Sequence, residues 1–503
     1  MVRKFFTTLS SIPQRTFVWF AVLAAASLSG YLILSASGSG AGFPLDDAWI
    51  HQTYARNLAS RGEWAFYQGE TSAGSTSPLW VSFLSIGYLV QANPVIFSAV
   101  LGWACMVALA WAVTIGFRAI LPDLAAWGPV VGLLLLLEWH LVWAAASGME
   151  TLLAGLVVTV VLVWLLKKPN RWYLVGILIG LGVWIRPDLI TLAAPAGLVV
   201  LLSPNLRSRK AWDLVGMLAG CLIPAVFYFL FNNAVGGTLL PNTFYAKQVE
   251  YRILQEIPIL DRYLAEFSLP LVGVGVVLLP GFCYLGWLAV RRRRWDLLVG
   301  VGWWFGYVGL YAWRLPVTYQ HGRYLIPAMP IFFLWGAAGT AAILAGWFKR
   351  GARSGRVVSI LARVWVITAV LVLCLFWGIG ARAFSRDVHF IESEMVEVSR
   401  WIEENTDQED LIAAHDIGAL GYFSGRRIVD LAGLVTPVVI PFIRDEERLA
   451  SYLDERSADY LVTFPGWYPD LTANRAAIYR TEGEVTPSLG DENMAVFVWK
   501  RSE

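Results

Sequence analysis

The sequence predicts a polytopic α-helical membrane protein that ends in a soluble, extracytoplasmic α/β domain. Three observations carry this prediction. Hydrophobic residues make up 57% of the 503 residues and charged residues only 15%, whereas globular proteins carry about 25% charged residues. Long stretches without Asp, Glu, Lys or Arg recur along residues 1–381, and about 18 such residues can cross roughly 30 Å of hydrocarbon. Residues 382–503 instead mix charged and apolar positions.

The charge-free stretches predict the spans. They cover 16–45, 71–117, 214–246, 267–290 and 324–348. Charged loops divide the rest, and we expect about 11 spans in all. Two of them come from the three apolar stretches near 78–90, 96–117 and 126–146, of which the short 78–90 is expected to be interfacial or re-entrant. The others are 16–36, 151–166, 172–185, 188–203, 212–232, 269–290, 297–314, 324–347 and 364–381.

Positive clusters predict the orientation, because cytoplasmic loops carry an excess of Lys and Arg. Arg3, Lys4 and Arg15 place the N-terminus in the cytoplasm of a cell whose plasma membrane the chain crosses. Further clusters at 167–171, 207–210, 291–294 and 349–356 mark cytoplasmic loops. An odd number of spans then puts the tail outside. The predicted domains are a membrane module over 1–381, with a first external loop at 38–78, and a soluble domain over 382–503.

Cysteine usage and net charge exclude several classes of function. The four cysteines all fall within apolar stretches, which predicts packing residues rather than a disulfide framework or a Cys/His metal cluster. The formal net charge is only +2, and nothing predicts a nucleic-acid partner.

The first external loop carries the densest polar chemistry. Asp46 and Asp47 stand where the first helix leaves the membrane, and either side chain can cap the following helix without any chemical role. Residues at four-residue spacing predict an amphipathic helix over 47–60, lying on the membrane. Its apolar face carries Ile50, Tyr54 and Leu58, and its polar face carries His51, Arg56 and Asn57.

Two further segments bear on function. Arg186 and Asp188 join two short apolar segments, and charged residues at membrane depth normally face a cavity or a partner. The alternative is a salt bridge that only closes the hairpin. The tail is expected to contain helices over 391–404 and 445–456 and strands at 411–414, 428–431, 460–463 and 494–499, and it shows no nucleotide-phosphate loop or nucleophile elbow.

A set of short motifs gives a more specific indication. They are 46–50 (DDAWI) with 54–58 (YARNL), 76–80 (TSPLW), 147–151 (SGMET), 186–188 (RPD), 240–247 (LPNTFYAK), 322–327 (GRYLIP), and 418–427 (GALGYFSGRR) with 430–434 (DLAGL). In this order the chain resembles the GT-C superfamily of membrane glycosyltransferases, in particular its bacterial arabinofuranosyltransferase/mannosyltransferase branch. The resemblance implies a sugar donor linked to polyprenyl phosphate. The chain departs from the pattern at Trp49 and His51, which leaves the sugar and the acceptor open.

The resemblance maps a catalytic acidic residue onto Asp46, with Asp47 adjacent. The chemistry fits independently, because an acceptor hydroxyl needs a positioned base to take its proton during attack. One base is enough if the displacement inverts configuration, since the lipid phosphate leaves without a proton. Capping or a structural role in a cavity is the alternative for both residues.

The leaving phosphate needs cations close by. Four candidates are expected on the external side or in the hairpin: Arg186, Lys247, His321 and Arg323. A solvated surface lysine is the alternative for Lys247. Glu150, with His51 and Asn242, is a candidate for acceptor binding. Glu150 is also a candidate ligand for Mg²⁺ or Mn²⁺ together with Asp46 or Asp47, since these ions prefer oxygen ligands.

Together these observations predict an inverting glycosyltransferase. It would move a sugar from a polyprenyl-phosphate donor to an envelope glycan, glycolipid or protein outside the cytoplasm, and the tail would help to bind the acceptor. A transporter or flippase for a lipid-linked sugar is the main alternative, although no inverted internal repeat is visible. A non-enzymatic envelope protein is the third.

Overall fold

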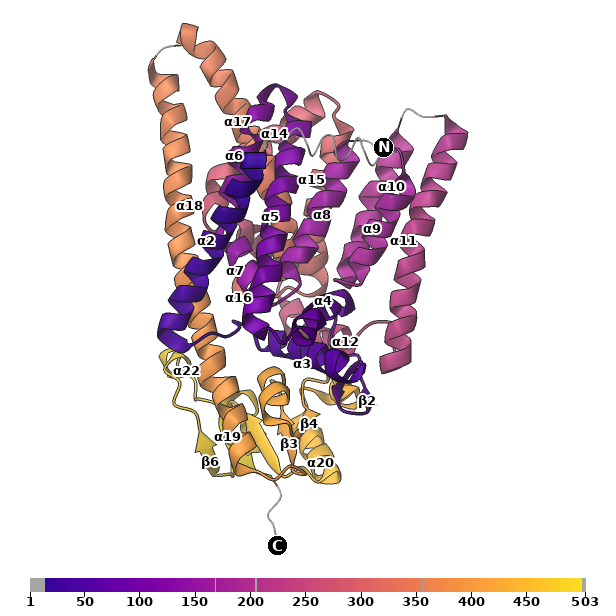
Figure 1. Ribbon diagram of the computed structural model, residues 1–503, viewed down its shortest axis with the longest axis vertical. Coiled ribbons are helices and arrows are strands. Elements are labelled where there is room, and N and C mark those ends of the chain that lie inside the picture. Colours follow the sequence, from indigo (N-terminus) through magenta and orange to yellow (C-terminus); the bar gives the residue numbers. More distant parts are fainter. Residues whose placement is uncertain (1–13, 168, 204–205, 355, 500–503) are drawn as a thin grey trace.

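The protein consists of a bundle of long helices with a small sheet region at one end (Figure 1). The computed structural model describes residues 14–167, 169–203, 206–354 and 356–499. The predicted cytoplasmic residues Arg3, Lys4 and Lys168 lie outside the described residues. The bundle and the sheet region together confirm the predicted fold class.

Long apolar helices form most of the bundle. Six helices in the described part of the chain are long and apolar enough to cross a membrane, or seven if one bent pair counts as a span. Four shorter apolar helices lie among them, so the predicted number of spans stays a prediction. The bounds of the helices are α2 (Gln14–Ser39), α4 (Pro78–Leu89), α5 (Pro94–Ile120), α8 (Thr151–Leu166), α9 (Trp172–Val183), η2 (Pro187–Leu192), α10 (Ala193–Leu202), α11 (Arg207–Gly236), α14 (Val274–Arg291), α15 (Trp295–Arg314), α17 (Met329–Ser354) and α18 (Arg356–Ile391).

The bent pair falls on the stretch predicted as one span at 126–146. Its first part runs over Pro122–Leu135, that is η1 (Pro122–Trp127) and α6 (Gly128–Leu135), its second part is α7 (Trp139–Ala146), and the two are bent by 56°. Glu138 lies at the break with an extended backbone, and its carboxylate accepts a hydrogen bond from the Leu141 amide. A side-chain cap of this kind begins a new helix, so the apolar stretch is not a single straight helix.

Glycines allow the bundle helices to approach closely. A Cβ atom at Gly176 of α9 would lie 2.0 Å from the Met217 carbonyl oxygen of α11, and one at Gly339 of α17 would lie 1.8 Å from the Gly281 carbonyl oxygen of α14. Small residues at such crossings are typical of membrane helices, where packing rather than the hydrophobic effect drives association.

The sheet region contains five short strands in the order β4 (Arg427–Asp430), β3 (Leu411–Ala414), β5 (Tyr460–Thr463), β7 (Ala495–Val498) and β6 (Ala477–Arg480). Strand β3 is parallel to β4 and β5, and the β5–β7 and β7–β6 pairs are antiparallel. Helix α20 (Glu446–Arg456) contributes to its separate apolar core. The predicted domain boundary at 382 lies inside α18, which continues through a π-helical turn, η6 (Glu392–Val396), into α19 (Glu397–Asn405).

Helix α3 (Asp46–Arg61) lies between the bundle and the sheet region (Figure 1). The predicted helix is therefore confirmed, but the expected exposure of its polar face is wrong. His51 and Asn57 are buried, because several segments pack on this face: His51 lies against Ser75 and Glu150, and Asn57 donates to the backbone of β1 (Ala65–Tyr67). Another segment is η7 (Leu420–Ser424), where the Tyr422 carbonyl accepts a hydrogen bond of 2.8 Å from Arg56 Nη1.

Candidate functional site

Three cations converge on one tyrosine next to Asp47. Tyr324 Oη accepts hydrogen bonds from Lys247 Nζ at 2.9 Å and from Arg323 Nη2 at 3.0 Å. Asp47 Oδ2 lies 2.8 Å from Arg323 Nη2 and 3.4 Å from Lys247 Nζ. The guanidinium of Arg186 lies 5.8 Å from the centre of the Tyr324 ring. We call Asp47, Arg186, Lys247, Arg323 and Tyr324 the basic cluster.

Distant parts of the sequence build this cluster. Asp47 stands in the first turn of α3, and Lys247 on α12 (Asn242–Glu250). Arg186 immediately precedes η2. Arg323 and Tyr324 follow the short helix α16 (Tyr319–Gly322). Three of the four cations that the sequence indicates as phosphate ligands, Arg186, Lys247 and Arg323, therefore meet at one place.

Arg186 is fixed by a second layer of polar groups. Its Nε donates to Asp188 Oδ1 at 3.1 Å and its Nη2 donates to Tyr311 Oη at 2.7 Å. Tyr311 Oη in turn donates to Asp188 Oδ2 at 2.7 Å, and Tyr307 Oη also bonds to this carboxylate. The expected salt bridge between Arg186 and Asp188 exists. Its role is not only to close the hairpin, because together with Tyr311 it fixes the buried guanidinium of Arg186 near Tyr324.

The backbone at 320–322 separates His321 from the cluster. Gln320, His321 and Gly322 have φ of 54°, 58° and 67°, a left-handed conformation that costs energy for residues other than glycine. His321 and Arg323, on either side of Gly322, have different partners. Its Nε2 lies 2.8 Å from Asp387 Oδ2, and its ring contacts Trp139 and Trp143. His321 is thus not among the groups that meet at Tyr324.

Asp46 and Asp47 are adjacent in the sequence but have different partners. The Asp46 carboxylate is buried and accepts hydrogen bonds from the Gly418 amide at 2.6 Å and the Ala419 amide at 2.7 Å. It does not cap α3, whose N-cap residue is Leu45 and has no side-chain cap. Burial, and then the charge of Asp416, raise the pKa of Asp46 above its usual range. Asp46 therefore joins α3 to the turn after β3.

Asp47 is held as an ion by its neighbours. Burial opposes its ionisation, but the positive charges of Lys247 and Arg323 outweigh burial and hold the pKa of Asp47 well below its usual range. Burial also opposes the charge of Lys247. The Asp47 carboxylate outweighs burial and raises the pKa of Lys247. Both groups are charged near neutral pH, and Asp47 is a weak base for as long as the two cations stay beside it.

The remaining predicted residues are engaged within the protein. Glu150 Oε2 lies 3.4 Å from His51 Nε2, and Glu150 Oε1 lies 3.8 Å from Arg186 Nη1. In the chain, Glu150 follows a left-handed turn at Gly148. The Gly148 carbonyl accepts a hydrogen bond of 2.8 Å from Trp80 Nε1. Asn242 Nδ2 donates to the Leu434 carbonyl at 3.1 Å, which fixes the start of α12 to the sheet region.

The residues do not fit the predicted Mg²⁺ or Mn²⁺ site. Asp46 is bonded to backbone amides, Asp47 to two cations, and Glu150 lies against His51 and Arg186. Within the described ranges, no group of three or more His, Cys, Asp or Glu side chains is placed to hold a metal ion. These three carboxylates therefore do not converge on one point in the structure, and the use of Mg²⁺ or Mn²⁺ stays a prediction.

Several polar groups beside the cluster escape prediction from the sequence. His415 Nε2 lies 3.3 Å from Glu250 Oε1, and His415 Nδ1 is 2.7 Å from Tyr468 Oη. Asp416 Oδ2 is buried and has no hydrogen-bond partner in the described part of the chain, and burial raises the pKa of this carboxyl. One signal was available, since Asp416 follows the carboxyl end of a parallel strand, where ligands of α/β sheets bind. Tyr324 stands next to Arg323 inside a motif already singled out.

Comparisons with known proteins show similarity to one family model and to several solved structures. A family described as a domain of unknown function (DUF8728) matches residues 386–497, and no curated protein matches the chain. Among solved structures, ArnT from Cupriavidus metallidurans bound to undecaprenyl phosphate superposes with a TM-score of 0.58 at 14% identity, over 96% of this chain and 98% of that one. The archaeal oligosaccharyltransferase AglB from Archaeoglobus fulgidus, in complex with an inhibitory peptide and a dolichol-phosphate, superposes with a TM-score of 0.55 at 13% identity. The match covers 89% of this chain and 69% of that one.

A mycobacterial enzyme extends this set. The arabinofuranosyltransferase AftD superposes with a TM-score of 0.50 at 14% identity, over 98% of this chain. This chain spans only 40% of the length of AftD. At such identities the similarity concerns the fold, and it covers the helical bundle together with the sheet region. The chain therefore has the GT-C fold that the sequence resemblance predicts.

Proposed function

We propose that the protein is an inverting glycosyltransferase that takes a sugar from a polyprenyl-phosphate donor. The acceptor is an envelope glycan, glycolipid or protein outside the cytoplasm. One observation carries the proposal: within this fold, three cations from distant segments of the chain surround Tyr324, and two of them contact Asp47. The undecaprenyl phosphate and dolichol-phosphate in the titles of two similar structures support a lipid phosphate as the ligand of these cations.

The cluster has unused capacity for an anion. Arg323 is buried, with 7% of its surface exposed, and its Nε has no hydrogen-bond partner among the residues described. A buried donor of this kind costs free energy unless a ligand uses it. Arginine and lysine bind phosphate oxygens through short, charge-assisted hydrogen bonds. Since the lipid phosphate gains negative charge as it leaves, the same cations would stabilise the transition state.

Asp47 is the base in this proposal, and donor binding activates it. When the donor phosphate engages Lys247 and Arg323, Asp47 loses the two charges that hold its pKa down, and its affinity for a proton rises. The acceptor hydroxyl then attacks the anomeric carbon, its proton passes to Asp47, and the bond from that carbon to the phosphate oxygen breaks. The products are the glycoside with inverted configuration and free polyprenyl phosphate.

The proposed topology follows from the two ends of the bundle. Helices α11 and α18 begin at the end opposite to the sheet region (Figure 1), and positive clusters precede or open both helices in the sequence. The positive-inside rule assigns that end to the cytoplasm. The basic cluster and the sheet region then lie on the outer side of the plasma membrane, and the N-terminus lies in the cytoplasm.

The experiment uses purified protein in lipid nanodiscs with a panel of synthetic polyprenyl-phosphate sugars and crude envelope acceptors. Mass spectrometry follows the release of polyprenyl phosphate by the wild type, Asp47→Asn and Asp46→Asn. We expect release by the wild type and its collapse in Asp47→Asn. If no donor releases polyprenyl phosphate, and the protein instead moves lipid-linked sugars across the bilayer of proteoliposomes, the protein is a flippase and the proposal fails.

A further inference from the structure

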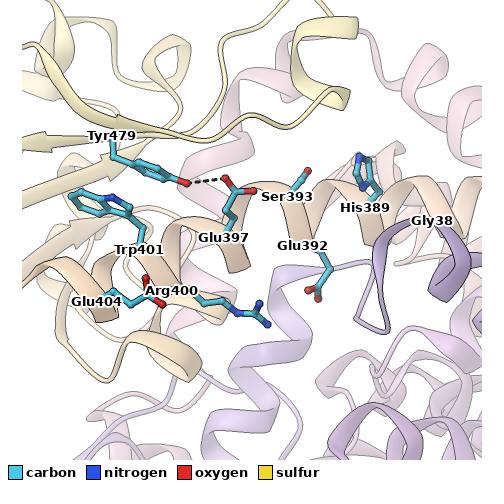
Figure 2. Close-up of a pocket in the computed structure, with 9 residues that line it drawn as sticks. All are labelled: Gly38, His389, Glu392, Ser393, Glu397, Arg400, Trp401, Glu404 and Tyr479. Carbon is cyan, nitrogen blue, oxygen red and sulfur yellow. Dashed lines mark hydrogen bonds between the residues drawn. The ribbon is translucent and has the colours of Figure 1, made fainter.

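A second pocket lies apart from the basic cluster, where α18 passes through η6 into α19. Its volume is about 550 Å³. Side chains of this helix line most of it, and Tyr479 reaches over from strand β6 (Figure 2). We call it the acidic pocket, after the side chains that define it: Glu392, Glu397, Arg400, Trp401, Glu404 and Tyr479.

Two aromatic rings form one wall of the acidic pocket. The rings of Trp401 and Tyr479 stack with their centres 4.9 Å apart and their planes at 12°. Tyr479 Oη donates a hydrogen bond of 2.7 Å to Glu397 Oε1, which Figure 2 shows as a dashed line. Aromatic rings next to carboxylates suit a sugar, whose apolar C–H face packs on a ring and whose hydroxyl groups donate to carboxylate oxygens.

The π-helical turn arranges the pocket. Within it, Glu394 points away and is fully buried, where it accepts hydrogen bonds from the Thr486 hydroxyl at 2.5 Å and from the Met494 amide at 3.0 Å. These bonds hold the turn to the sheet region. The neighbouring Ser393 lines the pocket, and its buried Oγ has no hydrogen-bond partner among the residues that the structure describes. Turns of this kind occur frequently at functional sites.

The charge of the acidic pocket selects the chemical class of ligand. The lining contains three carboxylates, those of Glu392, Glu397 and Glu404, together with the Arg400 guanidinium and the His389 imidazole. Within the described part of the chain no ion pair joins Arg400 to these carboxylates, so they keep their acceptor capacity. Like charges disfavour a phosphate or an anionic lipid headgroup here. A neutral, hydroxyl-rich ligand and a cation are both compatible with this charge, and the aromatic wall beside the carboxylate acceptors matches an uncharged saccharide.

We propose that the acidic pocket binds a neutral saccharide, about two or three sugar rings by its size, that belongs to the acceptor glycan. This inference rests on the proposed function, since it names the acceptor class. Gly38, at the exit of α2, also lines the pocket, which places the pocket at the end of the bundle next to the sheet region (Figure 1). The basic cluster lies at the same end, so one glycan chain would reach the two sites from the same side of the membrane.

The test uses the full-length protein in nanodiscs on an array of neutral, anionic and amino-substituted oligosaccharides. Saturation-transfer NMR then measures the affinity for the best-retained neutral oligosaccharide. We expect retention of neutral oligosaccharides, and binding weakened about tenfold or more in Trp401→Ala, which loses the stacking surface. Glu397→Gln, which keeps the size of the side chain, should also weaken binding. Glu455→Gln, an exposed carboxylate on α20, is the matched control and should bind as the wild type does.

Three outcomes overturn the inference. They are no retention of any neutral oligosaccharide, equal affinity in Trp401→Ala and wild type, and preferential retention of anionic glycans. Thermal unfolding of each variant shows that it is folded. Failure here is distinguishable from failure of the proposed function, because release of polyprenyl phosphate by the wild type is measured separately and depends on the basic cluster.

Discussion

The basic cluster and the acidic pocket lie at the same end of the helical bundle, but they handle charge in opposite ways. In the basic cluster Arg186 and Arg323 are buried, Lys247 is partly buried, and each contacts a carboxylate or a tyrosine hydroxyl. In the acidic pocket the three carboxylates keep contact with solvent, and of them Glu397 is bonded to a tyrosine rather than to a cation. The charges of the basic cluster are neutralised by partners within the protein until a ligand binds, whereas the carboxylates of the acidic pocket stay accessible to solvent.

Burial explains this difference. A buried ion must be paired, since removing it from water costs several kcal/mol, so the basic cluster contains Asp47 as the partner of its own cations. A ligand phosphate can replace that carboxylate as the partner of the two cations, and Asp47 then lacks its counter-charges until it takes up a proton. The partly exposed carboxylates of the acidic pocket are hydrated and need no such partner. The comparison therefore predicts that anion binding and proton transfer are linked in the basic cluster but not in the acidic pocket.

Replacing the carboxylate of the basic cluster should have the largest effect. We expect Asp47→Asn to lower the rate of polyprenyl phosphate release by about 10²–10⁴-fold, the usual contribution of a general base. Asp46→Asn is the adjacent control. It weakens one of two backbone contacts, so it should mainly lower the free energy of unfolding, by about 1–3 kcal/mol. A larger loss of rate in Asp46→Asn than in Asp47→Asn, with unfolding unchanged, would reverse the assignment.

Removing a cation of the basic cluster should have the next largest effect. Arg323→Gln leaves Asp47 with one cation and removes the guanidinium with the unused Nε. We expect the affinity for polyprenyl phosphate to fall by about 30-fold or more, as for the loss of one partner of a buried charge pair. Titration of nanodisc-embedded protein with polyprenyl phosphate measures this affinity. Arg456→Gln, on the exposed end of α20, is the matched control, and an equal loss in both variants would contradict the role of the cluster.

The link between donor binding and the base should appear in the pH dependence. In the free protein the pKa of Asp47 is depressed, so Asp47 is ionised above about pH 4 and kcat/KM should show no acid limb above that pH. In the donor complex the two cations serve the phosphate, so the pKa of Asp47 rises and the acid limb of kcat moves to higher pH by about one unit or more. Identical acid limbs in the pH profiles of kcat/KM and kcat would show that donor binding does not separate Asp47 from its two cations.

The sequence predicts the fold well because a lipid environment forces long helices whose backbone groups are bonded internally. It does not predict where a span breaks. The bend at Glu138 depends on one side chain that caps the next helix, and averaged hydropathy does not show it. The burial of the polar face of α3 was also beyond prediction, since that face is covered by residues far along the chain, among them Tyr422.

The candidate site was predicted in part. Motifs singled out Asp47, Lys247 and Arg323 separately, but their meeting at Tyr324 depends on helix packing and on the left-handed turn at 320–322. The same turn sends His321 to Asp387 instead. Asp46 shows the limit most clearly, because no local pattern indicates that its carboxylate bonds to the amides of Gly418 and Ala419. Adjacent carboxylates with equal sequence signals thus have unequal roles.

The smallest expected effect comes from removing divalent metal ions. Magnesium and manganese need several oxygen ligands directed at one point, whereas Asp46, Asp47 and Glu150 each face partners of their own. The cations of the basic cluster would supply the positive charge that the leaving phosphate needs. A chelator, followed by readdition of Mg²⁺ or Mn²⁺, should therefore change the rate of polyprenyl phosphate release by less than about twofold. A loss of rate that readded metal restores would mean that the donor phosphate brings the metal, and that Asp47 turns toward it when Lys247 and Arg323 move away.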